Sequence, residues 1–105
     1  MSLAPFVQIV ARGKGRARAM TLDEAQDAMG IILNGEAAPE AVGALLMVMR
    51  LRGETAAEIA GFTAALRAHV DGALPRSDLD WPSYAAGRSR GAPLFLLAAA
   101  LVGQA

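Results

Sequence analysis

The chain has 105 residues, of which 54% are hydrophobic, and ten Lys and Arg balance ten Asp and Glu. This length predicts one domain, and the high apolar share excludes an intrinsically disordered chain. Cysteine is absent, which excludes disulfides, zinc–thiolate sites and cysteine nucleophiles. Its absence is compatible with the reducing cytoplasm, where we expect the protein to reside.

Neither a signal peptide nor a membrane span is predicted. The first residues contain no basic region followed by an apolar run. The longest apolar runs, residues 41–49 and 93–102, are far shorter than the roughly 20 apolar residues that a span requires. Both runs are therefore expected to form core helices, and no membrane partner is expected.

The first predicted helix covers residues 4–11, where Phe6 and Ile9 recur at helical spacing. Gly13 and Gly15 end this helix and make the following basic stretch a flexible loop. That loop contains the cations Arg12, Lys14, Arg16 and Arg18. An anion-facing edge and an ordinary solvated loop beside an acidic helix are both compatible with this charge pattern.

The second helix is predicted to begin after Thr21, because Thr21 and Glu24 have the spacing of a capping box. Asn34-Gly35 predicts a left-handed end. One face of this helix is expected to be apolar, and it contains Leu22, Ala25, Met29, Ile32 and Leu33.

A third helix is predicted from Pro39 to the residue before Gly53, because proline suits a first helical turn and glycine suits an end. Residues 41–49 are apolar on every side of this helix. A helix without a polar face is normally surrounded by protein.

A fourth helix is predicted after Thr55, which forms a second capping-box pattern with Glu58, and Asp71-Gly72 is expected to end it. Small residues, mainly alanine, would let neighbouring helices approach closely. The apolar stripe of this helix is expected to contain Ile59, Phe62, Leu66 and Val70.

Apolar residues of the third and fourth helices are most simply interpreted as the core of the domain. The functional alternative is a dimer interface. The candidates for either role are Leu45, Leu46, Met47, Met49, Phe62 and Leu66.

Residues 73–92 contain prolines and glycines and carry the only Trp and Tyr, so they are predicted to be a connector. The expected organisation is a helical bundle at 1–72, the connector at 73–92 and a last apolar helix at 93–105. Together they form one all-α domain of about five helices. An apolar helix at the end of the sequence would expose a large apolar surface if no other protein covered it. We therefore expect a fragment of a longer protein.

Candidates for chemistry are few. His69 lies near the end of the fourth helix without a nucleophile–base pattern, which favours a surface histidine. Asp78 and Asp80 would point the same way in an extended segment, but no third ligand accompanies them, which favours solvated carboxylates. We expect no catalytic residue and no metal site in this chain.

Nucleic-acid binding is the alternative function that the cations suggest. Arg88 and Arg90 lie near Trp81 and Tyr84 in the sequence, and cations interleaved with aromatic side chains are typical of platforms for single strands. Scattered loop residues would give the same pattern, so both interpretations stay open. The cations of the first loop that can each neutralise a phosphate are Arg12, Lys14, Arg16 and Arg18.

The order of three stretches carries a resemblance to a known family: residues 11–18 with 21–25, residues 42–46 with 50–55, and residues 58–62 with 65–67. Their most specific pieces are Gly43-Ala44-Leu45-Leu46, Arg52-Gly53-Glu54-Thr55 and Glu58-Ile59-Ala60-Gly61. In this order they resemble the N-terminal helical domain of glycosyltransferase family 3, the group of anthranilate phosphoribosyltransferase and pyrimidine nucleoside phosphorylase. The resemblance covers nearly the whole chain.

The resemblance implies a small bundle that forms a homodimer and frames a cleft, with the catalytic machinery in a larger α/β domain beyond Ala105. Mg²⁺ and phosphoribosyl diphosphate would bind there only if the full-length parent is an active transferase. Residues 78–88 contain Trp-Pro-Ser-Tyr where the biosynthetic enzymes carry a Gly-Thr-Gly-Gly-Asp loop. This departure resembles a divergent branch that is associated with nucleic-acid binding.

Overall fold

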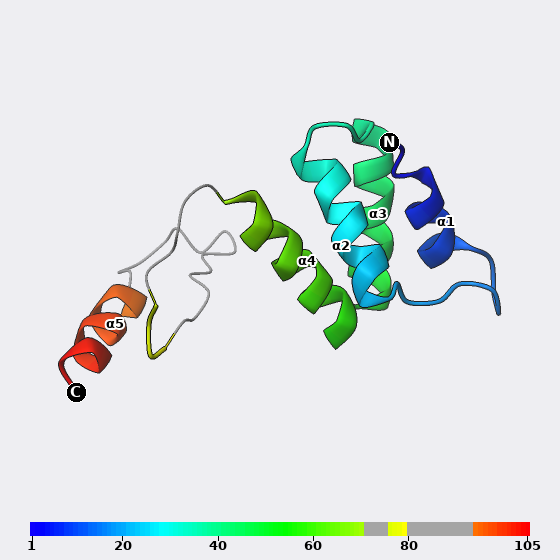
Figure 1. The fold of residues 1–105 in the computed structure, drawn as a ribbon. Helices are drawn as coiled ribbons and strands as arrows, with labels where there is room; N and C mark the ends of the chain where they lie inside the picture. The colour runs from blue at the N-terminus through cyan, green and yellow to red at the C-terminus, as the bar shows by residue number, and fades with distance from the viewer. Residues whose placement is uncertain (71–75, 80–93) are drawn as a thin grey trace. The chain divides into compact units, whose positions relative to one another are not determined.

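The computed structural model describes residues 1–70, 76–79 and 94–105, and these residues form five α-helices and no strand (Figure 1). The helices are α1 (Ala4–Ala11), α2 (Leu22–Leu33), α3 (Pro39–Arg52), α4 (Ala56–His69) and α5 (Leu94–Gln104). The prediction of an all-α fold is therefore confirmed. No helix in the described ranges combines the length and the hydropathy that a bilayer-spanning segment requires.

The chain consists of two compact units, which we describe separately. Unit 1 is Met1–Gly72 and contains α1 to α4, whereas unit 2 is Ala73–Ala105 and contains α5. Most of the predicted connector lies outside the described residues, and so does the predicted helix end at Asp71-Gly72.

Both predicted capping boxes are present. The Thr21 hydroxyl accepts from the Glu24 amide at 3.2 Å, and the Glu24 carboxylate accepts from the Thr21 amide at 2.8 Å. Thr55 and Glu58 repeat this exchange at 3.3 and 2.8 Å. Each box satisfies amides that a helix start would otherwise leave without partners, so α2 and α4 begin where the sequence predicts.

Glycines follow the ends of α2 and α3, as predicted, and both have a positive φ. Gly35 has a φ of 74°, and its amide donates to the Ile32 carbonyl while the Glu36 amide donates to the Ile31 carbonyl. This pair of bonds is a Schellman motif. Gly53 has a φ of 81° and donates to the Met49 carbonyl.

In unit 1, α2 packs along α4 and α1 packs along α3 (Figure 1). The central apolar cluster draws on α1, α2, α3 and the segments next to α1. Its buried side chains are Leu3, Val10, Met20, Ala25, Ala28, Ile31, Leu45 and Met49.

The buried face of α2 matches the predicted one only in part: Ala25 is buried and Ile32 packs against the core, as predicted. Leu22 is 42% exposed, and the buried positions of this helix are Ala25, Ala28 and Ile31. Hydrophobic periodicity predicts the buried face of a helix from the positions of its largest side chains. At the contact between α2 and α4, the short distance between the two helices also limits which side chains fit. Next to Gly61 of α4, this close approach leaves room for Ala25 and excludes larger residues.

The contact between α2 and α4 is closest at Gly61. A β-carbon added at Gly61 would collide with the Leu22 carbonyl oxygen, and it would lie 2.7 Å from the Ala25 β-carbon and 2.9 Å from the Gln26 amide nitrogen. Two of these three neighbours are backbone atoms, which cannot move without shifting α2. Glycine at this position therefore fixes the distance between the two helices.

Candidate functional site

One side of α3 carries apolar side chains that no part of unit 1 covers. Leu46 and Met47 are each 61% exposed and Leu51 is 80% exposed, whereas Leu45 and Met49 are buried in the core. We call Leu46, Met47 and Leu51 the α3 outer face. Among the candidates on α3, the interpretation as core therefore fits Leu45 and Met49, and Val42 and Val48 pack against the same cluster. Leu46, Met47 and Leu51 would need a cover that unit 1 does not provide.

Most of the apolar stripe predicted for α4 is exposed. Ile59, Leu66 and Val70 are about half exposed, and Phe62 is half-buried at the edge of the core. These four residues are named the α4 stripe here. The buried positions of α4 are instead Glu58, Gly61 and Ala65. Of the four stripe residues, only Phe62 packs against the core, and Gly61 rather than a large residue meets α2.

Glu58 is the one buried charged residue in the part of the chain that the structure describes. Its Oε1 atom accepts from the Met20 amide at 2.8 Å and from Arg52 Nη2 at 2.6 Å, while Oε2 accepts from the Thr55 amide. The side chain of Glu58 is 0% exposed and that of Arg52 is 27% exposed. This carboxylate therefore joins the loop before α2, the end of α3 and the start of α4.

Burial raises the pKa of Glu58, but the amides of Thr55 and Met20 and the Arg52 guanidinium outweigh it, so the pKa lies below its ordinary value. The capping pattern in the sequence identifies Glu58 as a helix start. It does not reveal the burial, because the Met20 amide is 38 positions away in the chain. The only local signal is an arginine six positions earlier.

The basic loop folds back on α1. The Arg16 amide donates to the Gly13 carbonyl, Gly15 has a φ of 82°, and the Arg18 amide donates to the Ile9 carbonyl at 3.1 Å. A hollow of about 300 Å³ results between the loop and α1. Its lining residues, which we call the arginine hollow, are Pro5, Gln8, Ile9, Arg12, Arg16 and Arg18.

Arg18 differs from the other cations of the loop because it is already paired. Its two terminal nitrogens donate to the two carboxylate oxygens of Glu24 at 2.8 and 2.7 Å. The hydrogen bonds from Arg18 and from the Thr21 amide lower the pKa of Glu24 to about 2. Arg18 thus fastens the end of the loop to α2, and its charge is largely neutralised there.

The other predicted cations have different positions. Lys14 is exposed and does not line the arginine hollow. Arg88, Arg90 and the aromatic residues near them lie outside the described residues. The structure therefore brings three of the predicted cations, Arg12, Arg16 and Arg18, to one place.

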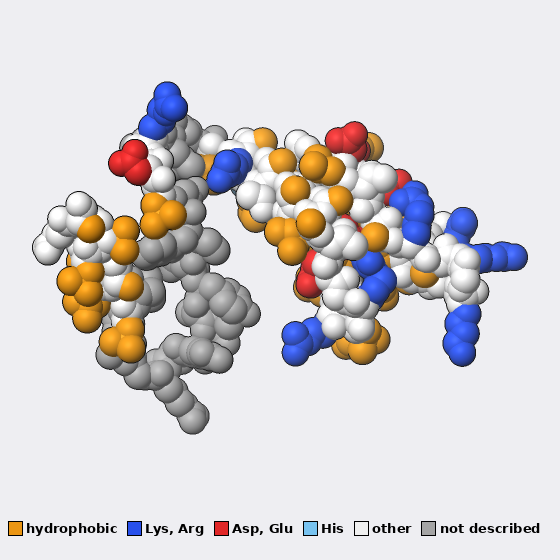
Figure 2. Space-filling model, turned by 90° about the horizontal axis from the view of Figure 1, so that it is seen from below, with side chains coloured by type: hydrophobic (Ala, Val, Ile, Leu, Met, Phe, Trp, Pro, Cys, Tyr) orange, Lys and Arg blue, Asp and Glu red, His pale blue; other side chains and the backbone are white. Residues whose placement is uncertain are grey.

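Figure 2 shows hydrophobic side chains that reach the surface of unit 1 and of α5, and Lys and Arg side chains that project at the end of unit 1 with the basic loop. In α5, Leu94 is 69% exposed, and Leu96, Leu97 and Leu101 are each close to 60% exposed. Like the α3 outer face, α5 presents far more apolar surface than an isolated soluble helix normally keeps.

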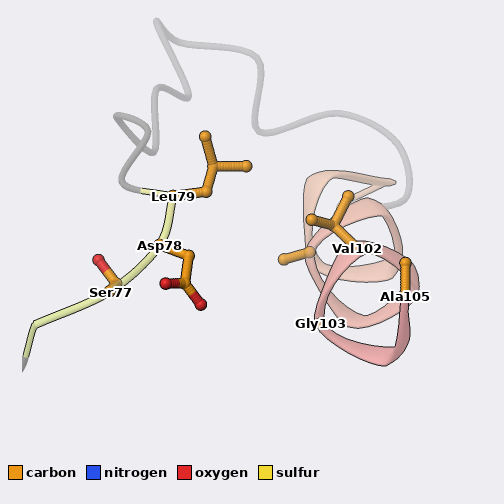
Figure 3. A pocket seen from close by; sticks show the side chains of 7 residues that line it. Ser77, Asp78, Leu79, Val102, Gly103 and Ala105 are labelled. Atoms are coloured by element: carbon orange, nitrogen blue, oxygen red, sulfur yellow. The ribbon is translucent and has the colours of Figure 1, made fainter.

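Unit 2 contains a hollow between the segment around Asp78 and the end of α5 (Figure 3). Among its lining residues, all of them described, only Asp78 has a titratable side chain. The predicted companion, Asp80, lies outside the described residues. In the described ranges no three His, Asp or Glu side chains gather as metal ligands would, and His69 is exposed in the last turn of α4.

The family model of the glycosyl transferase family, helical bundle domain, matches residues 6–70, which is more than half of the chain. The chain belongs to this family. The match begins within α1 and ends at the residue that follows α4. The glycosyl transferase helical bundle therefore corresponds to unit 1, with both capping boxes, Glu58 and the basic loop inside it.

Curated relatives point the same way. The chain is 46% identical over 68 residues to the anthranilate phosphoribosyltransferase of Rhizobium rhizogenes, which covers 65% of this chain and 19% of that enzyme. It is 49% identical over 51 residues to the enzyme of the same name from Thermomicrobium roseum, and 53% identical over 51 residues to that of Rhodopseudomonas palustris; each match covers 49% of this chain and 15% of the relative. The matched segment is thus a fifth or less of these relatives' length.

Proposed function

We propose that this helical bundle is the association domain of an anthranilate phosphoribosyltransferase-like protein, where it holds two copies together and frames a cleft. The observation that carries the proposal is the exposure of Leu46, Met47 and Leu51 on α3. Burial of apolar area drives most protein association, and obligate interfaces resemble a core cut in two. Two copies would give α3 the cover that unit 1 does not provide.

The bundle itself supplies no chemistry in this proposal. The relatives that are named anthranilate phosphoribosyltransferase are several times longer than the matched segment. We therefore assign any transferase reaction, together with Mg²⁺ and phosphoribosyl diphosphate, to an α/β domain outside this chain. We place the protein in the cytoplasm.

Association is tested by light scattering or sedimentation of the purified chain at tens of micromolar. Met47→Glu places a charge on the α3 outer face and should convert a dimer into a monomer, because burying an unpaired carboxylate is costly. Leu66→Glu tests in the same way whether the α4 stripe takes part in dimer formation. Ala57→Glu is the matched control, since Ala57 is exposed and nine positions from Leu66, half a turn away around α4. A wild-type chain that stays monomeric at this concentration contradicts the proposal.

Nucleic-acid binding is the second candidate function, and the observation in its favour is the grouping of Arg12, Arg16 and Arg18 around one hollow. Phosphate contacts release counterions, so the binding constant for a single-stranded oligonucleotide should fall steeply as salt is added. Replacing the four loop cations Arg12, Lys14, Arg16 and Arg18 with Ala should flatten this dependence. Binding that is unchanged in the quadruple variant removes the loop from this candidate function.

A further inference from the structure

The arginine hollow has the features of a built anion site. The loop is held at both ends, because the Arg18 amide donates to the Ile9 carbonyl of α1 and the Arg18 side chain is bound to Glu24 of α2. Between these points the turn from Gly13 to Arg16 closes with its own hydrogen bond of 3.0 Å. The hollow therefore exists before any ligand binds, and little ordering of the backbone is needed on binding.

The charge in the hollow is uncompensated. None of the residues that line it is acidic. Arg18 is neutralised by Glu24, but no ion pair within the described ranges involves Arg12 or Arg16. The electrostatic attraction of the hollow therefore comes from these two guanidinium groups. Gln8 adds a side-chain amide that can donate a further hydrogen bond.

Guanidinium groups select planar or tetrahedral oxyanions, because their forked donors match pairs of oxygen atoms. Two unpaired guanidinium groups beside one amide favour an anion of more than one negative charge over a single carboxylate. We infer that the arginine hollow binds phosphate groups, with Arg12 and Arg16 as the direct contacts and Arg18 as the residue that holds the loop in place.

This inference deepens the second candidate function. It rests on that function only if the phosphate belongs to a nucleic-acid strand. The group can belong to a free oligophosphate or to the backbone of a nucleic-acid strand, and the two sources share the chemistry that the hollow recognises. Two probes separate them: inorganic pyrophosphate, and a short single-stranded oligonucleotide. Binding of each to the full chain is measured by titration calorimetry at fixed ionic strength.

The decisive comparison is between single substitutions that remove the same charge. Arg12→Gln and Arg16→Gln should each weaken the binding of a recognised probe by about tenfold, the effect of losing one charge-assisted contact. Arg50→Gln is the matched control, because it removes the same guanidinium charge at an exposed position of α3 that does not line the hollow. It should change the affinity by no more than about twofold through the general field.

Each outcome has one meaning. Pyrophosphate binding that depends on Arg12 and Arg16 supports the site even if the oligonucleotide does not bind, and in that case only nucleic-acid binding fails. Oligonucleotide binding that Arg50→Gln weakens as much as Arg16→Gln overturns the site but leaves a diffuse nucleic-acid surface. Failure of both probes to bind overturns the inference.

Discussion

At the scale of single residues, Glu58 shows how one side chain can hold together segments that are distant in sequence. It begins α4 through the Thr55 amide, accepts from the Met20 amide and pairs with Arg52. All three partners are donors, so the ionised carboxylate satisfies them and a neutral group cannot. A buried carboxylate in such a network is retained only when its hydrogen bonds offset the loss of hydration.

Replacing Glu58 with Gln tests this role. The side-chain amide of Gln carries an NH₂ donor where Glu58 has an accepting oxygen, so at least one of the three donors would lose its partner. We therefore expect the free energy of unfolding at neutral pH to fall by about 3 kcal/mol. Because the folded pKa of Glu58 is below its ordinary value, its stabilisation is present above about pH 4.3 and is lost as the pH falls through the folded pKa.

Denaturant titrations from pH 7 to pH 3 measure both effects. The Glu58→Gln variant should lose less stability in acid than the wild-type chain, and the slope that remains comes in part from Glu24. Glu54→Gln is the control, because Glu54 is exposed four positions earlier, and it should leave the stability at neutral pH close to that of the wild-type chain. A neutral-pH stability of Glu58→Gln equal to that of the control would refute this role for the carboxylate.

At the scale of elements, the pairing of α2 with α4 depends on a missing side chain. Gly61→Ala is expected to lower the free energy of unfolding by about 1–3 kcal/mol, because the added methyl group meets backbone atoms of α2. Gly30→Ala in α2 is the matched control, since a β-carbon there meets nothing within 4 Å. That change should stabilise by about 0.5–1 kcal/mol through helix propensity. Thermal unfolding of the two variants should therefore shift in opposite directions.

Helix ends were predictable from the sequence, whereas helix faces were predictable only in part. Thr21, Thr55, Gly35 and Gly53 act within one turn of their own positions, so local patterns are sufficient to identify them. Which side of α4 packs inward depends instead on its partner. The small residue Gly61 meets α2, and the larger Leu66 remains at the surface. Apolar periodicity assumes that the largest side chains are the buried ones, and close helix pairs reverse that order.

The candidate site was also predictable from the sequence only in part. Sequence clustering indicated the basic loop, because its cations are neighbours along the chain. It could not indicate that Arg18 is bound to Glu24, or that Arg12 and Arg16 share a hollow from which Lys14 is absent. These differences arise from the turn at Gly15 and from the hydrogen bond between the Arg18 amide and Ile9, which are properties of the folded loop.

At the scale of the whole molecule, the distribution of apolar side chains is more informative than their number. Unit 1 buries a compact set of residues, yet Met47 and Leu51 of α3 and Leu96 of α5 stay largely exposed. A self-contained domain of this size would use such residues to enlarge its core. The relatives, which are far longer than the segment that they share with this chain, fit a bundle that works in contact with other protein.

The position of Glu58 has a consequence for how unit 1 comes apart. Met20 lies directly before the cap of α2, and the carboxylate that accepts from its amide also starts α4. When the first turn of one helix frays, the first turn of the other loses a hydrogen bond as well. The starts of α2 and α4, joined by a hydrogen bond between residues 38 positions apart, are therefore expected to unravel as a single cooperative event.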